Sequence, residues 1–477
     1  MRSLDRLSLV RSMSGRSASF VDRYMGVRRE GTDPLGIGEE NIRINTLHGI
    51  LNSAALNMVG PFTAIFAMRI GATQLHVALL TSAPAIVSLL AMIPGARFID
   101  RTERKKRVTL VFMAANRVGY LFLACVPFFA HGVQASIFVL LLALMNLPGA
   151  VSNIAWQAFI SRIVPPEKRS RAFAARNRLM NLFGTTITVC TGLFLDHSVF
   201  PIGYQLAFVG AFVVAVAELL VFRKINDTGT GDGVIGGRSE PITDDSATAP
   251  AQPPQATSER RSALAVRFNL RIGALMRSQL TEILSEKRFV RYMLVSVYFY
   301  LAWQTPWPLF SWYQVRILHA NNLWVSILAL LNTGGALAGY GYWQRMLDKR
   351  GNLRTLLISS LPIFIVPLVY AFSGSLLIIG LSNLVIGAIF SGVNLALFNT
   401  LLEMTPETKK ATYLAYYTTA VTVASVLAPL LGVAFLQVMS FRYSFIACAA
   451  FRLSGSLAFL FMERLERRKE AEPLPAT

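Results

Sequence analysis

Charged residues are scarce in this sequence, and acidic residues are the scarcer kind. Asp, Glu, Lys and Arg make up 15% of the 477 residues, whereas soluble domains carry about a quarter. Apolar residues make up 53%, and the mean hydropathy is +0.48. The 46 basic residues outnumber the 26 acidic ones, but they lie in short segments between apolar runs rather than together on a soluble face. The composition therefore predicts an integral membrane protein and argues against nucleic acid as a partner.

Cysteine and histidine are too few and too scattered to build several common sites. The three cysteines, Cys125, Cys190 and Cys448, all fall inside apolar runs, so we expect packing residues rather than disulfides. The five histidines form no H-E-x-x-H pattern of the kind that a zinc protease needs. The sequence also lacks the G-x-S-x-G elbow of serine hydrolases. We therefore expect no enzymatic activity, no metal and no cofactor.

Twelve apolar segments are long enough to cross a hydrocarbon core about 30 Å thick. Six precede a polar gap, at residues 45–68, 75–98, 108–130, 134–163, 172–195 and 201–222. Six follow it, at residues 289–314, 322–346, 353–372, 375–403, 411–438 and 441–462. They predict an all-α integral membrane fold with twelve transmembrane helices in two pseudo-symmetric six-helix bundles, at residues 43–223 and 289–463.

The polar segments predict two tails and a linker. Residues 1–42 are rich in Arg and Ser and have no apolar core of a secretory signal. They predict an N-terminal tail, with an organellar transit peptide as the alternative. Residues 224–288 are rich in Gly and Pro and predict a linker, in which apolar residues from Ser262 to Ser285 recur near helical spacing with arginines between them. This pattern is typical of an amphipathic helix on a membrane surface, and a disordered tether is the alternative. Residues 464–477 predict a C-terminal tail.

Lysine and arginine gather in the loops of one side only. The loops after the second, fourth, eighth and tenth spans are basic, whereas the opposite loops hold only Arg69, Arg316 and Arg442. Basic short loops face the cytoplasm, so the pattern predicts that both tails and the linker are cytoplasmic. Because the pattern requires twelve spans, it also supports their number.

The loop after the second span has a recognisable signature. Residues Gly95 to Arg107 read G-A-R-F-I-D-R-T-E-R-K-K-R. They resemble the major facilitator superfamily signature G-x-x-x-D-R/K-x-G-R/K-R/K, although Glu103 stands in place of its second Gly and Ala96 in place of its first, with Gly95 one residue farther from Asp100. The residues on its charged positions are Asp100, Arg101, Arg104 and Lys105.

The two halves repeat one another in their basic loops. V-P-P-E-K-R-S-R-A-F follows the fourth span and M-T-P-E-T-K-K-A-T-Y follows the tenth. The loop after the eighth span, L-D-K-R-G-N-L-R, repeats the signature at Asp348 and Lys349. Such repeats are common in transporters.

The resemblance covers roughly residues 43–465 and carries functional expectations. It implies a monomeric secondary transporter of the cell inner membrane, with a central cavity that opens to alternate sides. The sequence leaves the coupling ion open, with a proton or a sodium ion as the candidates. It also implies a gating role for the signature residues, in which Asp100 docks at the start of the eleventh span, around Ala411 to Tyr413, and Arg104 braces it. The implied gating residues are Asp100, Arg101, Arg104, Asp348 and Lys349.

Polar residues at helical spacing on the first, fourth, fifth and seventh spans predict the lining of this cavity. A polar side chain in the hydrocarbon region is costly unless it faces water or a partner. The alternative is that these side chains join helices through hydrogen bonds worth about 0.6 kcal/mol each. The candidate substrate contacts are Asn52, Asn153, Gln157, Arg176, Asn177, Tyr300, Gln304 and Trp307.

Ionised residues within the spans separate into three groups. Arg176 is the candidate anion contact, whereas Arg117 and Arg452 are expected to pair within the fold. Glu218 and Glu403 lie near span ends, where we expect solvated carboxylates, with a proton site as the alternative.

The candidate lining residues predict a small neutral or anionic organic solute. No acidic residue lies on the polar stripes, so the counter-charge that a buried cation needs is missing. Tyr300, Trp303 and Trp307 offer flat apolar faces opposite Arg176. One alternative is a flippase or efflux pump for lipid-like or drug-like amphiphiles. Another is a cavity for lipophilic cations, in which a helix carbonyl holds Arg176.

Overall fold

The computed structural model describes residues 37–100, 102, 104–163, 166–226, 282–406 and 410–471. Within them the chain is helical and has no strand, which confirms the predicted all-α fold. Residues 1–36 and 472–477 of the two tails, residues 262–281 of the amphipathic segment, Arg101 and the side chain of Asp100 lie outside the described residues. The expectations for these parts remain predictions.

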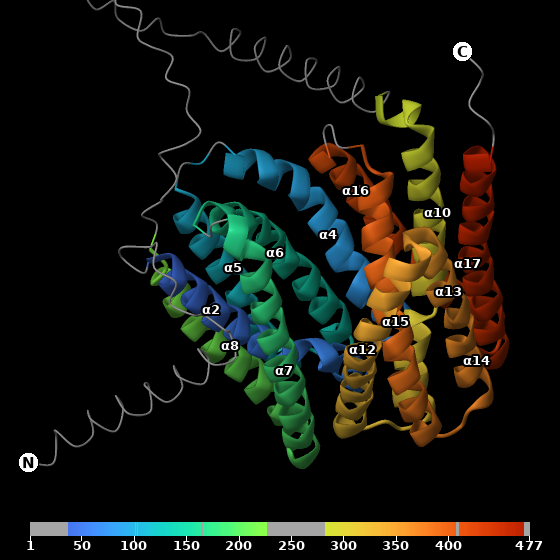
Figure 1. The fold of residues 1–477 in the computed structure, drawn as a ribbon. Coiled ribbons are helices and arrows are strands. Elements are labelled where there is room, and N and C mark those ends of the chain that lie inside the picture. The colour runs from blue at the N-terminus through green and yellow to red at the C-terminus, as the bar shows by residue number, and fades with distance from the viewer. Residues whose placement is uncertain are drawn as a thin grey trace, which may run out of the picture.

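The first half contains the predicted spans one to six (Figure 1). Span one is built from α2, the short helix η1 and α3, because Pro61 interrupts the helix. The elements are α2 (Ile37–Val59), η1 (Gly60–Phe62), α3 (Thr63–Arg69), α4 (Gln74–Asp100), α5 (Lys105–Cys125), η2 (Val126–Phe128), α6 (Gln134–Ile163), α7 (Pro166–His197) and α8 (Ile202–Arg223).

The second half repeats the pattern, with breaks in spans seven and nine. The elements are α10 (Lys287–Gln304), α11 (Trp307–Trp312), the π-helical turn η3 (Tyr313–Ile317), α12 (Asn322–Arg350), α13 (Asn352–Ser360), η4 (Leu361–Phe364), α14 (Ile365–Phe372), α15 (Leu376–Met404), α16 (Lys410–Val438) and α17 (Phe441–Ala471).

Span seven is the least regular of the twelve. In the described part of the chain, eleven helical segments are long and apolar enough to cross a membrane. The exception is α10, which begins with three basic residues in two turns and ends at Gln304. Pro306 has no N–H for the helical ladder, so α11 and η3 complete this span after the break. The predicted range 289–314 is therefore two helices rather than one.

Helices α12 and α15 form the closest helix pair of the second half. A Cβ added to Gly335 would lie 1.8 Å from the Leu384 carbonyl oxygen, and one added to Gly387 would lie 1.9 Å from that of Asn332. Small residues in membrane helices allow this approach of backbones. The Trp343 indole N–H donates to the Ala388 carbonyl at 2.6 Å. We call this contact the glycine seam.

The two halves meet through α7 with α12 and through α4 with α16 and α11. At the end of α7, the Asp196 carboxylate accepts hydrogen bonds from the backbone N–H of Asn322 at 2.9 Å and of Leu323 at 2.8 Å. The Asn322 side-chain amide also donates to it at 2.9 Å. Free N–H groups and the helix dipole make the start of a helix a good site for a carboxylate. We call this contact across the halves the latch.

Further hydrogen bonds between the halves lie near the latch. Tyr204 donates its hydroxyl to the Asn322 side-chain oxygen at 2.6 Å, and Ser326 donates to the Thr188 carbonyl at 3.0 Å. Arg316 donates to the carbonyl of Met68. Helix direction places these groups on the face opposite the basic loops that follow α4, α6, α12 and α15. We name these faces the latch face and the basic face.

The helices of the two halves diverge toward the basic face. Figure 1 shows that the end of α4 leans away from the start of α16. The sequence predicts that Asp100 docks at this start of α16; because the Asp100 side chain lies outside the described residues, this docking remains a prediction. The latch is closed in this arrangement. It is the state expected of a transporter open toward its basic face.

Candidate functional site

A cavity of about 390 Å³ lies inside the first half. Its walls come from α2, α5, α6 and α7, which present polar side chains among the apolar surfaces of Leu56, Met113 and Met180. The polar lining residues are His48, Asn52, Asn116, Arg117, Asn146, Ser152, Asn153, Trp156 and Arg176.

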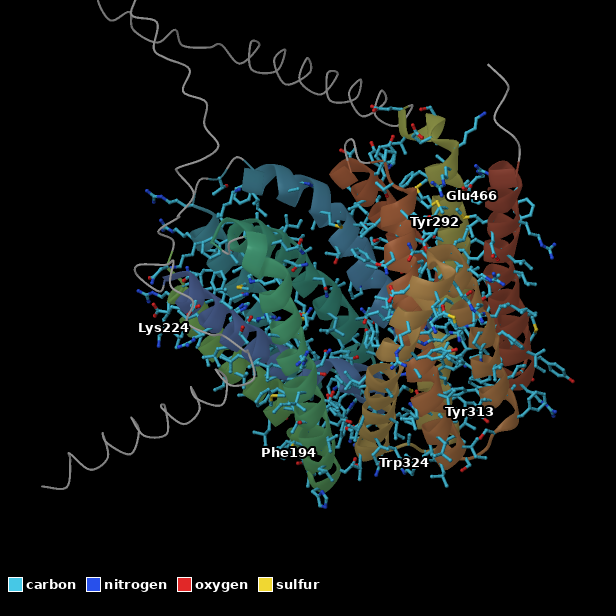
Figure 2. All side chains as sticks on the ribbon, in the orientation of Figure 1. Phe194, Lys224, Tyr292, Tyr313, Trp324 and Glu466 are labelled. Carbon is cyan, nitrogen blue, oxygen red and sulfur yellow. The ribbon has the colours of Figure 1, made fainter. Side chains whose placement is uncertain are left out.

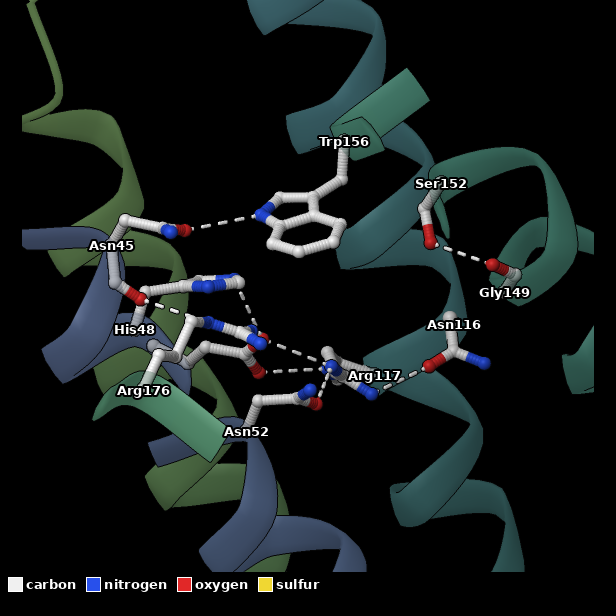
Figure 3. Close-up of polar contacts among 10 residues, drawn as sticks. Asn45, His48, Asn52, Asn116, Arg117, Gly149, Ser152, Trp156 and Arg176 are labelled. Carbon is white, nitrogen blue, oxygen red and sulfur yellow. Dashed lines mark hydrogen bonds and ion pairs between the residues drawn. The ribbon is translucent and has the colours of Figure 1, made fainter. Parts of the chain in front are cut away.

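Arg117 of α5 is held on all sides of its guanidinium group (Figure 3). Its Nε and one terminal nitrogen donate to the two carboxylate oxygens of Glu218 of α8, each at 3.0 Å. The other donors reach the side-chain oxygens of Asn52 at 2.7 Å and Asn116 at 2.8 Å. Arginine suits such a two-pronged pair because its donors form a planar fork. The expectation that Arg117 pairs within the fold agrees with these contacts.

Glu218 is completely buried, so the expectation of a solvated carboxylate is wrong. Its side chain is 0% exposed. The reason is that α2 begins at Ile37, well before the predicted span, and packs along α8. The Asn41 side-chain amide also donates to the Asn226 carbonyl at 3.1 Å, closing the end of α8. Glu403 is the contrasting case, because its side chain is 43% exposed as predicted.

His48 completes the charged cluster from α2. Its Nε2 lies 3.1 Å from a Glu218 oxygen, without the alignment of a hydrogen bond, and its Nδ1 has no hydrogen-bond partner. The ring stacks on Trp156 with centroids 6.4 Å apart and lies 5.1 Å from that of Phe222. The buried imidazole is therefore positioned by packing and by its proximity to the Glu218 carboxylate, and neither ring nitrogen makes an aligned hydrogen bond.

Arg176 of α7 faces the same cavity in a different way. Its Nε donates to the Asn45 carbonyl at 3.3 Å, and its guanidinium lies 4.7 Å over the Trp156 ring. Gly49 leaves room for it, since a Cβ there would lie 2.6 Å from the Arg176 Nε. Among the described residues no carboxylate forms an ion pair with Arg176, and no hydrogen bond uses its terminal nitrogens. These donors are available to a bound group.

The structure brings three of the eight predicted substrate contacts to this cavity, namely Asn52, Asn153 and Arg176. Gln157 and Asn177 are exposed and do not line it. Asn116 belongs to the site but was not predicted from the sequence. Glu218 also belongs to it, although the sequence predicted a solvated carboxylate there, with a proton site as the alternative. The sequence signal for the Arg117–Glu218 pair was that each is the only charged residue in its own apolar run, and that both runs belong to the first half.

The three contacts predicted on span seven lie elsewhere. Gln304 is 7% exposed and donates to the Ser425 hydroxyl of α16 at 3.0 Å. Tyr300 packs on Trp303, at 5.5 Å between ring centroids. Trp307 lines a separate cavity of about 330 Å³ between the halves. Trp303 is buried among Phe299 and Phe390, so its face is not open, because α10 turns these side chains toward α16 and the core.

Arg452 of α17 is 1% exposed. It donates to the backbone carbonyls of Trp303 and Ile363, and its guanidinium lies 5.3 Å over the Phe310 ring. The expected pairing within the fold is therefore made with backbone oxygens beside the break between α10 and α11.

The predicted gating residues that are described lie on the basic face. Arg104 is exposed directly before α5, and Asp348 and Lys349 are exposed in the last turn of α12. Nearby, Arg288 pairs with Glu466 at 2.8 Å and with Glu403 at 3.6 Å. Their gating role remains a prediction.

Comparison with a sequence family decides the class of protein. In the described residues no group of three or more His, Cys, Asp and Glu side chains is placed to hold a metal ion. The sequence model of the Major Facilitator Superfamily matches residues 47–280 and 292–477. The chain belongs to this superfamily. No curated protein sequence matches it significantly.

Solved structures share the fold of this major facilitator protein. One is a bacterial homologue of the human lysosomal transporter Spinster, in an inward-facing and unoccupied conformation. The match covers 94% of this chain and 100% of the homologue, with a TM-score of 0.59 and 13% sequence identity. A POT family transporter in complex with a thioalcohol-conjugated peptide covers 89% over 96%, with a TM-score of 0.63 and 15% identity. The nucleoside transporter NupG covers 89% over 98%, with a TM-score of 0.57 and 10% identity. The chain is thus a multi-pass membrane protein with a transporter fold.

Proposed function

We propose that this chain is a secondary active transporter that moves a small anionic organic solute with an apolar portion by alternating access. The observation that carries the proposal is the charge of the cavity in the first half. Arg117 and Arg176 both face it, whereas Glu218 is the only carboxylate that the described residues bring to the cluster. The sequence left neutral and anionic solutes open, and this imbalance favours the anion.

The two arginines have different roles in this proposal. Arg117 already has Glu218 as its counter-charge and holds the walls together. Arg176 contacts a carbonyl and an aromatic ring, neither of which cancels a full charge. Its terminal N–H groups match the geometry of a carboxylate, sulfonate or phosphate. The anion would bind there, with the amide of Asn153 within the same lining and the Met side chains beside its apolar part.

Two alternatives make different demands on the same cavity. A lipophilic cation would need an unpaired carboxylate, and the helix carbonyl on Arg176 does not supply one. A volume of about 390 Å³ lies at the lower end of ordinary ligand sites, so a whole lipid would have to leave its chains outside. Movement of labelled lipid between leaflets of reconstituted vesicles would support the flippase alternative.

Matched compounds separate these cases. We expect benzenesulfonate to raise the thermal unfolding temperature of the purified protein more than benzenesulfonamide does, and phenyltrimethylammonium to leave it unchanged. Arg176→Gln should remove the effect of the sulfonate. Arg178→Gln is the control, because Arg178 is on the same helix but exposed and outside the cavity lining. Stabilisation by the cation, unaltered in Arg176→Gln, would contradict the proposal.

We also propose that the basic face is cytoplasmic and that the chain lies in a cell inner membrane. The three native cysteines are free, and Cys125 and Cys190 are exposed, so labelling needs a background without them. A single cysteine at Thr102 should then react with an impermeant maleimide only from the cytoplasmic side. One at Ser198 should react only from the other side. Labelling of both from one side would remove the proposed orientation.

A further inference from the structure

We propose that this transporter exchanges one anion for another, because its empty cavity retains one uncompensated positive charge and closes only when an anion occupies it. The inference rests on the proposed function. It adds the mode of transport, which neither the fold nor the predicted site residues specify.

The charge count uses the groups that the structure places around the cavity. Arg117 and Glu218 are ion-paired and sum to zero. A protonated His48 would leave a buried N–H unpaired, since Nδ1 has no partner, so we count His48 as neutral. Arg176 then contributes the surplus charge of one unit.

Closure of the basic face would take this charge out of contact with water. Arg176 is already only 6% exposed in the open arrangement. The space that water can still occupy is the cavity of about 390 Å³ beside it. A buried charge without a counter-charge is costly, so the empty protein should remain open toward the basic face. A bound monoanion brings the sum to zero and removes this cost.

Exchange follows from this difference between the empty and loaded states. A carrier that changes sides only when loaded returns only with a second anion from the opposite side. Net transport without a counter-anion would require the empty protein to close, which the surplus charge disfavours. Ligands shift a conformational equilibrium only by their differential affinity for the two states, and here that difference is electrostatic.

The first experiment uses no solute. Nitroxide labels at Thr102, after α4, and Thr412, in the first turn of α16, report closure of the basic face by their distance. At pH 8 and low salt, Arg176→Gln should increase the closed population roughly tenfold, and Glu218→Gln should decrease it. Arg176→Lys keeps the charge and should match the unsubstituted protein. The double variant Arg176→Gln/Glu218→Gln restores the surplus of one unit and should match it as well.

The direction of these shifts decides the charge argument. Opposite shifts of the two single variants, cancelled in the double variant, support it. Equal shifts, or none in Arg176→Gln, overturn it. Should Glu218→Gln fail to fold, the comparison of Arg176→Gln with Arg176→Lys still tests the effect of charge.

The second experiment measures exchange directly. Benzenesulfonate stays ionised and does not cross lipid as a neutral acid. Its uptake into proteoliposomes should be more than roughly tenfold faster when they contain benzenesulfonate than when they contain benzenesulfonamide. Equal uptake from both would overturn exchange while leaving anion transport intact. Absence of benzenesulfonate binding would instead contradict the proposed function, and the label distances would remain a separate test of the charge rule.

Discussion

Arg117→Met is expected to lower the free energy of unfolding by roughly 3–5 kcal/mol, because it leaves Glu218 in the core without its counter-charge. The carboxylate is fully buried, and both of its oxygens accept hydrogen bonds from Arg117. Asn52 and Asn116 would lose their shared donor as well. Thermal or denaturant unfolding of the purified protein, followed by circular dichroism, measures the loss.

The double variant Arg117→Met/Glu218→Leu is the control for this prediction. Replacing both members of a buried ion pair by apolar residues is often neutral or stabilising, so the double variant should recover most of the loss. Arg178→Met, at an exposed arginine, should change stability by less than about 0.5 kcal/mol. A double variant less stable than Arg117→Met would mean that Glu218 has partners besides Arg117 that matter more.

Asp196→Asn should open the latch face. The substitution keeps the size of the side chain but replaces charge-assisted hydrogen bonds to three N–H groups at the start of α12. Hydrogen bonds to charged groups contribute about 1.5–3 kcal/mol, and 1.4 kcal/mol is a tenfold change in an equilibrium constant. We therefore expect the population open at the latch face to rise by roughly ten- to a hundredfold.

Nitroxide labels at Val199 and Ile317 would report this opening as a longer distance between the halves. Glu403→Gln is the matched control, because Glu403 contacts only its own half through Asn352 and Arg288. It should leave the distance unchanged. The latch would lose its assigned role if Asp196→Asn gave the same distance distribution as the unsubstituted protein.

The fold was predictable because apolar length and loop charge are local properties of the sequence. Long runs without charge give the spans, and basic loops order them. The breaks in spans one and seven carried a signal too, since Pro61 and Pro306 lie within the predicted ranges. Sequence periodicity alone does not reveal whether such a proline is accommodated in one helix or divides it, because neighbouring helices decide how the freed backbone groups are satisfied.

Only those features of the site that depend on a single helix were predictable from the sequence. Polar spacing selected Asn52, Asn153 and Arg176, which share the cavity. Polar spacing along one helix does not predict contacts between helices. Glu218 was predicted to be solvated because the sequence did not show that α2 extends beyond its apolar run. The latch was missed for the same reason, since Asp196 and Asn322 belong to different halves and nothing local joins them. The sequence also does not give the orientation of α10 about its axis. In the structure this orientation directs Gln304 toward α16 and Trp303 into the core, away from the predicted site.

The glycine seam provides a fixed internal reference for studying motion. Backbone atoms of α12 and α15 approach too closely for either helix to slide or rotate without collision, so both should move as one body. Figure 1 labels the two helices, and Figure 2 shows side chains on them in the same orientation. Two probes on exposed positions such as Leu337 and Val385 should therefore keep a constant separation whatever solute is present. A third probe on α7, measured against that pair, would report the displacement of the first half relative to the second.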